Sequence, residues 1–479
     1  MSRYSIAGLA GTLAGLISFP ILTRMLSVSD YGLLTLIITT ITFIAAFGKC
    51  GLQFSIVRYY SDIKDKVGAG RWDRSTYYSS IVFSMMGIGL FVTIIWMLVV
   101  YFLPDTTWGE PKLRYLFLLT GIVILSSVTL SMLTGFLQAR QQSGWLSLFK
   151  VSECYGVLIA VVITLYFITR SLEGVFIARI LVHVTLVSIL AFYVLRNIQL
   201  SPHSFSPKMT REMLTYGMPL LGNELVFVIF SLGDRYIINW KMGSESLGIY
   251  AAGYALCEYI KIMMVDSLFQ AIRPMYFQIW AEKGVAATKN FIENSLYFYL
   301  IICFPVIAGA AVVGPDLLTF ITGGKYTESG VVIPYIIAGQ MIYGTHSMLG
   351  AGIFIKKSSA LMWITFSAAL VNVLLNIVFI PVYGIEGAAM ATLISYLLMT
   401  VSETLYSRQL LVIDFPFLAA LKFIIISILM YFVLDQIEID GLLLNEIMIK
   451  IIVGGLLYGS LLLITDHKAR SLVMERLKK

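Results

Sequence analysis

Charged side chains occur inside the long apolar stretches of this chain, where charge is normally rare. About eight of the 34 Lys and Arg residues lie within such stretches. A charge at the centre of a membrane-spanning helix costs about 2.5–3.5 kcal/mol, so it usually faces a helix-bundle interior or a water-filled cavity. Cations there can bind an anionic cargo, and carboxylates can pair with cations or carry protons. The cations are Arg24, Lys49, Lys150, Arg179, Arg235, Lys261, Lys422 and Lys450, and the carboxylates are Glu153, Glu224, Asp234, Glu258, Asp266 and Glu403.

Several of these residues share a helical face by their spacing, because residues three, four or eleven positions apart lie on the same side of a helix. A purely structural ion pair is an equally good interpretation of each such pair. In the first half of the chain, however, the apolar stretches contain four cations and only one carboxylate, Glu153. This excess of positive charge favours an anionic cargo. Lys150, Lys422 and Lys450 can also reach water from near the span ends, and Arg24 can simply anchor its helix. The spaced pairs are Arg179 with His183, Glu224 with Arg235, and Glu258 with Lys261.

The elements that position these charges are predicted to be membrane-spanning helices. Of the 479 residues, 58% are hydrophobic and 13% are charged, whereas soluble proteins have about 25% charged residues. The mean hydropathy is +0.87, and a spanning helix needs about 20 apolar residues. We expect an all-α polytopic membrane protein with about 14 transmembrane helices. The expected spans are 5–26, 33–56, 76–103, 113–137, 145–168, 174–195, 213–239, 247–272, 291–314, 331–354, 359–380, 386–406, 416–435 and 446–465.

The cations in the loops predict how these spans are oriented. About 21 Lys and Arg residues lie in the loops of one side, which include both termini, and about five lie on the other side. Short loops rich in Lys and Arg face the cytoplasm. The prediction is a multi-pass protein of the inner (plasma) membrane with both termini cytoplasmic and a first span that is not cleaved as a signal peptide. The external loops are all short, the longest being about 315–330.

A repeat becomes visible when the chain is shifted by about 216 residues. “LSVSDYGLL” then falls on “MGSESLGIY”, “QFSIVRYYSD” on “FQAIRPMYFQ”, “GFLQARQQS” on “GIFIKKSS”, and “SLEGVFIARI” on “YGIEGAAMAT”. An even number of spans separates the paired segments, which predicts a parallel repeat whose halves rock around a central cavity. The predicted domains are a six-helix half at 1–200, a second six-helix half at 201–410, and two extra transmembrane helices with a cytoplasmic tail at 411–479.

Motifs for catalysis and metal binding are absent from the sequence. There is no GxxxxGK[ST], HExxH or GxSxG, so nucleotide hydrolysis, zinc proteolysis and serine hydrolysis are not expected. The four cysteines fall in predicted spans without metal-ligand spacing. Membrane topology explains the net charge of +7 better than nucleic-acid binding does. We therefore expect no enzymatic activity, no cofactor and no metal site, with H⁺ or Na⁺ coupling left open.

Four stretches carry a resemblance to a known family. They are “FPILTRMLSVSDYGLL”, “GLQFSIVRYYSD”, “YGMPLLGNELVFVIFSLGDRYII” and “SESLGIYAAGYAL”. With them, the chain resembles over essentially its whole length the Wzx-type polysaccharide and O-antigen flippases, the polysaccharide-transport branch of the multidrug/oligosaccharidyl-lipid/polysaccharide exporter superfamily. The resemblance implies alternating-access transport of a polyprenyl-pyrophosphate-linked oligosaccharide from the cytoplasmic to the periplasmic leaflet. Membrane lipids, a polysaccharide polymerase and a chain-length regulator are the other partners that it implies, and nucleic acid is not one.

The intramembrane charges fit this task. We expect the pyrophosphate to bind Arg24, Lys49 and Arg179, with Arg235 and Lys261 as candidates in the second half. The carboxylates that are candidates for ion coupling are Glu224, Asp234, Glu258 and Asp266. The sequence does not encode the sugar, the coupling ion or the polymer that is served.

Three other functions remain as alternatives. A drug or cation antiporter of the same superfamily would have twelve spans and a cavity dominated by carboxylates. A membrane-embedded polymerase, ligase or glycosyltransferase would carry its chemistry in large external loops, for which the longest loop here leaves little room. A scaffold without transport would not need charges buried in both halves.

Overall fold

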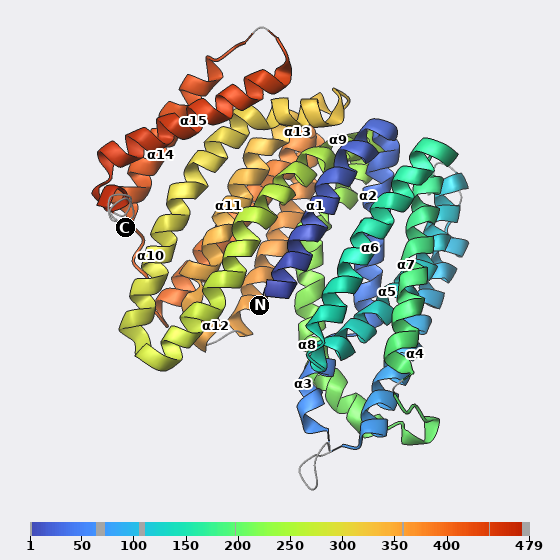
Figure 1. Ribbon diagram of the computed structural model, residues 1–479. Coiled ribbons are helices and arrows are strands. Elements are labelled where there is room, and N and C mark those ends of the chain that lie inside the picture. Colours follow the sequence, from blue (N-terminus) through green and yellow to red (C-terminus); the bar gives the residue numbers. More distant parts are fainter. Residues whose placement is uncertain are drawn as a thin grey trace. The chain divides into compact units, whose positions relative to one another are not determined.

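The computed structural model describes residues 2–63, 72–104, 111–196, 198–356, 359–439 and 441–471 (Figure 1). These ranges are almost entirely helical and contain no β-strand. The expected all-α fold is thereby confirmed. The chain divides into two compact units, Met1–Leu232 and Gly233–Lys479.

The first unit is built around α5, which packs against α2, α4, α6 and α7. Helix α8 packs against α2, α3 and α4 of the same unit. This is why the compact unit ends after Leu232, whereas the sequence repeat divides the chain near residue 200. The helices are α1 (Ser2–Met25), α2 (Val28–Lys49), α3 (Leu52–Tyr59), α4 (Arg74–Phe102), α5 (Pro111–Ala139), α6 (Ser143–Ile163), α7 (Leu172–Leu195) and α8 (Pro207–Leu232).

The second unit is centred on α11, which packs against α9, α10 and α13. Helices α14 and α15 pack on each other and on α10. The elements are α9 (Asp234–Lys261), the π-helical η5 (Ile262–Asp266), α10 (Ser267–Thr322), the 3₁₀ segment η6 (Thr327–Val332), α11 (Ile333–Leu349), α12 (Ala351–Lys356), α13 (Ser359–Arg408), α14 (Phe417–Asp435) and α15 (Leu443–Thr465).

Several long helices are interrupted by glycines with positive φ. Gly243 in α9, Gly284 in α10 and Gly384 in α13 have φ of 87°, 76° and 61°, a region that glycine enters without steric cost. Within the described ranges, nine helices are long and apolar enough to cross a membrane when such kinked helices are counted as one. With the long helices divided at these glycines, the structure is roughly consistent with the 14 expected spans.

A break between α2 and α3 lies inside the expected span 33–56. Cys50 and Gly51 both have positive φ, 51° and 74°, and α3 starts at the next residue. A Cβ built on Gly51 would lie 2.1 Å from the carbonyl oxygen of Gly217 on α8, and a Cβ on Gly217 would lie 2.5 Å from that of Gly51. The two backbones are therefore in direct contact, and this contact holds the end of α2 beside α8.

Candidate functional site

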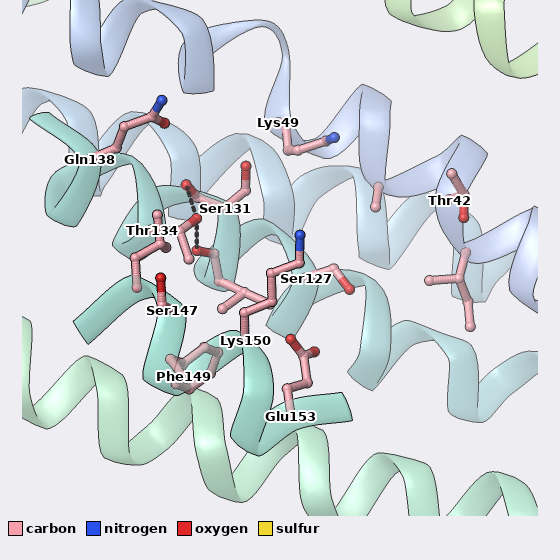
Figure 2. A pocket seen from close by; sticks show the side chains of 14 residues that line it. Thr42, Lys49, Ser127, Ser131, Thr134, Gln138, Ser147, Phe149, Lys150 and Glu153 are labelled. Carbon is pink, nitrogen blue, oxygen red and sulfur yellow. Dashed lines mark hydrogen bonds between the residues drawn. The ribbon is translucent and has the colours of Figure 1, made fainter. Parts of the chain in front are cut away.

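A cavity of about 530 Å³ with polar, charged and apolar lining residues lies within the first unit and is lined by α2, α5 and α6 (Figure 2). Helix α5 contributes a stripe of polar side chains at intervals of three and four residues, which is the spacing of one helical face. Helix α6 contributes residues three apart, and α2 contributes residues seven apart. The polar and charged lining residues are Thr42, Lys49, Ser127, Ser131, Thr134, Gln138, Ser147, Lys150 and Glu153.

Lys49 enters this cavity from the last turn of α2. Its side chain is 19% exposed, and its Nζ donates to Oε1 of Glu224 on α8. The other oxygen of Glu224 accepts from Nε2 of Gln53 at 2.7 Å. The backbone contact at Gly51 brings these residues together, because Gln53 follows it and Glu224 lies two turns after Gly217. Of the expected substrate and coupling residues, Lys49 and Glu224 thus form one ion pair.

Lys150 and Glu153 occupy the opposite wall on α6. Lys150 is exposed, and Figure 2 shows its amine directed into the cavity. Glu153 is hydrogen-bonded through Oε1 to Nδ1 of His183 on α7, at 2.8 Å. Lys150 is therefore a cavity residue. It was counted among the intramembrane cations of the first half, but it was not among the residues expected to bind the pyrophosphate.

Arg24 and Arg179, the other two cations expected to bind the pyrophosphate, do not line this cavity. Arg24 lies exposed in the last turn of α1, and Arg179 lies half-buried on α7. His183, which shares a face with Arg179 by spacing, has Glu153 as a partner. The structure therefore brings together Lys49, Lys150 and Glu153, a set that only partly overlaps with the expected one.

In the second unit, Asp234 and Arg235 form a buried cluster at the start of α9. Their side chains are 3% and 9% exposed, and Arg235 Nη1 lies 3.3 Å from Asp234 Oδ1. Asp234 Oδ2 accepts from the hydroxyl of Tyr250, and the Arg235 guanidinium lies 4.7 Å above the ring of Tyr254. Glu224 and Arg235, which their spacing placed on one helical face, have different partners. The reason is that they lie on different helices, since α8 ends before Gly233 and α9 begins after it.

The remaining expected residues lie further along α9 and in η5. Lys261 Nζ donates to Glu258 Oε1 at 2.7 Å, which is the ion pair that their spacing suggested. Gln340 of α11 donates to the second oxygen of Glu258 at 3.1 Å. Asp266 is half-buried at the end of η5. In the described part of the chain, no three His, Cys, Asp or Glu side chains are grouped so that they could hold a metal ion.

Sequence reasoning missed two features of these units. The first is the α5 stripe, whose signal was the polar spacing at 127, 131, 134 and 138. The second is a pair between His346 of α11 and Glu403 of α13. Glu403 was noted among the carboxylates inside apolar stretches, but its separation from His346 by 57 residues gives no local signal for the pairing.

Known proteins resemble this chain in sequence and in fold. A candidate O-antigen transporter of Shigella flexneri is 22% identical over 404 residues, which cover 83% of this chain and 94% of that protein. The lipid II flippase MurJ in an inward closed conformation matches with a TM-score of 0.77 and 16% identity, over 99% of this chain and 100% of that one. An inward-facing multidrug resistance MATE family transporter of the MOP superfamily matches with a TM-score of 0.61 and 15% identity, over 83% and 94%.

The likeness to the two solved structures establishes the fold of α1–α15 as that of this transporter group. The family itself is established by sequence. The model described as polysaccharide biosynthesis protein matches residues 1–280, which is more than half of the chain and includes the whole cavity. The family expected from the four sequence stretches is thereby confirmed, and the proteins that this chain resembles are transporters and flippases rather than enzymes. The chain belongs to the polysaccharide biosynthesis protein family.

Proposed function

We propose that this protein is a flippase that moves a polyprenyl-pyrophosphate-linked oligosaccharide from the cytoplasmic to the outer leaflet by alternating access. The observation that carries the proposal is the cavity in which Lys49 and Lys150 lie across from each other, with hydroxyl and amide side chains of α5 lining the same cavity. The family and the flippase names of similar proteins support it.

The chemistry of such a cargo matches this lining. By a Born estimate, moving an ionised phosphate through hydrocarbon costs roughly tens of kcal/mol. Each hydroxyl without a hydrogen-bond partner adds several kcal/mol to this cost. Lysine amines compensate the phosphate charge, and the Ser, Thr and Gln side chains of α5 replace water around sugar hydroxyls. The polyprenyl tail needs no such site, because it can stay in the lipid.

Ion coupling is proposed to act through the carboxylates that hold the cations. Lys49 forms an ion pair with Glu224 in the structure. A pyrophosphate that enters the cavity would therefore compete with the Glu224 carboxylate for the Lys49 amine. Protonation of Glu224 would release Lys49 to the cargo, and H⁺ is the coupling ion that this exchange favours. Asp234, Glu258 and Asp266 are proposed to act in the second unit, where Arg235 and Lys261 are already held by carboxylates.

The location of the protein follows from the same proposal. We place it in the inner (plasma) membrane with both termini in the cytoplasm, where its cargo is made. A polysaccharide polymerase and a chain-length regulator are the proposed partners that receive the product. The expected external loop at 315–330 is reduced in the structure to the turn between α10 and η6, where residues 323–325 are exposed. Reporter fusions of alkaline phosphatase and a fluorescent protein to the C-terminus and to this turn would test the orientation.

The decisive test is complementation of a strain that lacks its own flippase, with surface polysaccharide as the readout. We expect wild type and Lys150→Arg to restore the polymer and Lys150→Ala to restore little. Arg24→Ala, Arg24→Lys, Arg179→Ala and Arg179→Lys test whether these exposed and half-buried arginines lie on the cargo path. Lys208→Ala is the matched control, because Lys208 is an exposed cation outside the cavity.

Expression of each variant in the membrane is measured alongside. Full polymer in Lys49→Ala and Lys150→Ala would remove the cavity from the cargo path. No polymer with wild type in hosts that make different lipid-linked glycans would contradict the flippase proposal itself.

A further inference from the structure

A second pocket of the first unit, with a volume of about 410 Å³, lies where several of its helices begin or end. Its volume is within the range of about 300–1,000 Å³ that small-ligand sites have. None of the roles proposed above for cargo or coupling uses this pocket. Its polar lining residues are Tyr60 of η1 (Tyr60–Asp62), Arg74, Ser75 and Tyr78 at the start of α4, Arg140 directly after α5, and Gln199 after α7.

The pocket is separate from the cavity that contains Lys49 and Lys150. No described residue lines both. Gln138 of α5 lines the cavity, and Arg140, whose N–H still bonds to the Phe136 carbonyl as in a helix, lines the pocket. Residues two positions apart point to nearly opposite sides of a helix. The pocket is therefore a site of its own and not an extension of the cavity.

Tyr78 holds the Arg140 side chain at the pocket. Arg140 Nε donates to the Tyr78 hydroxyl at 3.1 Å, and the guanidinium lies 5.1 Å from the centroid of the Tyr78 ring. Tyr78 is itself buried and meets the rings of Tyr77 and Phe136 edge-on, at 5.0 and 5.1 Å. Because Nε is bound in this way, the two terminal amino groups of the guanidinium can form the paired hydrogen bonds that a phosphate accepts.

Positive charge predominates in this lining. Arg74 and Arg140 are the charged residues, and no carboxylate is found among the described residues that line the pocket. Asp73 caps α4 by accepting from the Ser75 N–H at 3.1 Å, and neither it nor Asp62 of η1 lines the pocket. Two guanidinium groups together favour an anionic ligand, and their planar donor geometry suits a phosphate.

The pocket lies at the level of the membrane surface. Arg74 comes just before one expected span, and Arg140 and Gln199 come just after two others. The loop cations predict that these span ends face the cytoplasm. Tyrosines such as Tyr60 and Tyr78 are typical of the membrane–water interface. Lipid headgroups occupy the same level, and the cytoplasmic leaflet attracts basic residues because it contains anionic lipids.

We propose that this pocket binds the phosphate of an anionic lipid of the cytoplasmic leaflet. Arg74 and Arg140 bind the phosphate oxygens. The Tyr78 hydroxyl accepts from Arg140, so its own proton is donated to the ligand, and the Gln199 amide supplies a further donor. A free phosphate offers the same oxygens, but it has no acyl chains to keep it at this depth. The inference goes beyond the flippase proposal and shares with it only the orientation in the membrane.

The first experiment measures lipid binding to the full-length protein in a neutral detergent by native mass spectrometry. The probes are phosphatidylglycerol, which is anionic, and phosphatidylcholine, whose choline balances its phosphate. Inorganic phosphate is added as a competitor. The variants are Arg74→Ala and Arg140→Gln. Arg196→Ala is the matched control, because Arg196 is an exposed arginine at the end of α7 that does not line the pocket.

We expect wild type and Arg196→Ala to bind phosphatidylglycerol more tightly than phosphatidylcholine. Arg74→Ala and Arg140→Gln should each bind phosphatidylglycerol about fivefold more weakly than wild type. Equal binding of the two lipids by wild type, or the same affinity in Arg74→Ala, Arg140→Gln and Arg196→Ala, would overturn the proposal. Displacement of phosphatidylglycerol by an equal concentration of inorganic phosphate would show a site for free phosphate and overturn its assignment to a lipid.

The second experiment measures the thermal unfolding temperature in the same detergent, which also shows whether each variant is folded. A ligand that binds only the folded state stabilises it, so phosphatidylglycerol should raise the unfolding temperature of wild type and Arg196→Ala. The rise should be smaller in Arg74→Ala, which removes an exposed side chain. An equal rise in Arg74→Ala would contradict binding at this pocket. Failure of these tests leaves the flippase proposal standing, and failure of complementation leaves the lipid site standing.

Discussion

Lys49 and Glu224 are joined by an ion pair that links the end of α2 to α8. The amine that faces the cavity is therefore already bound to a carboxylate, at side-chain exposures of 19% and 24%. A cargo anion that binds Lys49 therefore either displaces Glu224 or shares the amine with it, because a lysine ammonium has three N–H donors.

Breaking this pair should separate a stability effect from a transport effect. Lys49→Ala leaves a partly buried carboxylate without its cation, and we expect a loss of about 1–3 kcal/mol. Lys49→Ala combined with Glu224→Gln should recover most of the stability but no transport, because the charge that would bind phosphate is gone. Thermal unfolding in detergent and complementation measure the two effects. Recovery of transport in the double variant would show that Lys49 serves only the fold.

The contact between Gly51 and Gly217 should tolerate no side chain. Gly217→Ala places a Cβ 2.5 Å from the carbonyl oxygen of Gly51, and Gly51→Ala adds an unfavourable positive φ to a similar clash. We expect either variant to lower the thermal unfolding temperature clearly. Gly222→Ala on the same helix is the matched control, since its Cβ meets nothing within 4 Å, and it should be neutral or stabilise by about 0.5–1 kcal/mol. Equal effects of Gly217→Ala and Gly222→Ala would contradict the close approach.

The α5 stripe should govern transport without governing folding. Ser131→Leu fills part of the cavity and removes a hydroxyl, so we expect reduced surface polysaccharide at normal expression. Ile122→Leu on the outer face of the same helix, where the side chain is 47% exposed, should have no effect. Normal polymer in Ser131→Leu would mean that the cargo does not pass this part of the cavity.

Asp466, which follows the end of α15, should make the stability of the second unit depend on acid pH. Burial favours the protonated form, but hydrogen bonds from the Tyr297 hydroxyl and the Ala469 N–H, and the charge of Lys422, outweigh it and lower the pKa of Asp466. A carboxyl whose pKa is lower in the folded state stabilises the fold above its unfolded pKa of about 3.9, and this stabilisation is lost as pH falls through the folded pKa.

The measurement for Asp466 is the thermal unfolding temperature at neutral and acid pH. Asp466→Asn should unfold at a lower temperature than wild type at neutral pH, and the difference should shrink on acidification below about pH 4. A difference that stays constant with pH would assign the effect to packing rather than to the charge.

Much of the fold could be predicted because hydrophobicity has a long and simple signal. The helical class and the approximate spans follow from apolar runs such as 76–103 and 446–465, which α4 and α15 confirm. The break at Cys50–Gly51 was not predicted, because the apolar run continues through it. Its cause is the approach of α8, which lies some 160 residues further along the chain.

The candidate site was only partly predictable for the same reason. The charge of Lys49 is visible in the sequence, but its pairing with Glu224 depends on how α2 and α8 cross. Arg24 and Arg179 have the same local signal as Lys49 and do not line the cavity. Lys150 lines the cavity because α6 is rotated so that its Lys150 side points toward α2 and α5. Charge and hydropathy alone do not encode this rotation. Side-chain pairing across helices is a property of packing and not of spacing.

The crossing of Gly51 and Gly217 also limits how related sequences can diverge. A methyl group on either residue strikes the main chain of the other, and main-chain atoms cannot move aside as a side chain can. Chains that keep this crossing must therefore keep both positions free of side chains together. A chain that has a larger residue at one of the two positions must have separated the helices there, and with them the lysine and glutamate that this crossing joins.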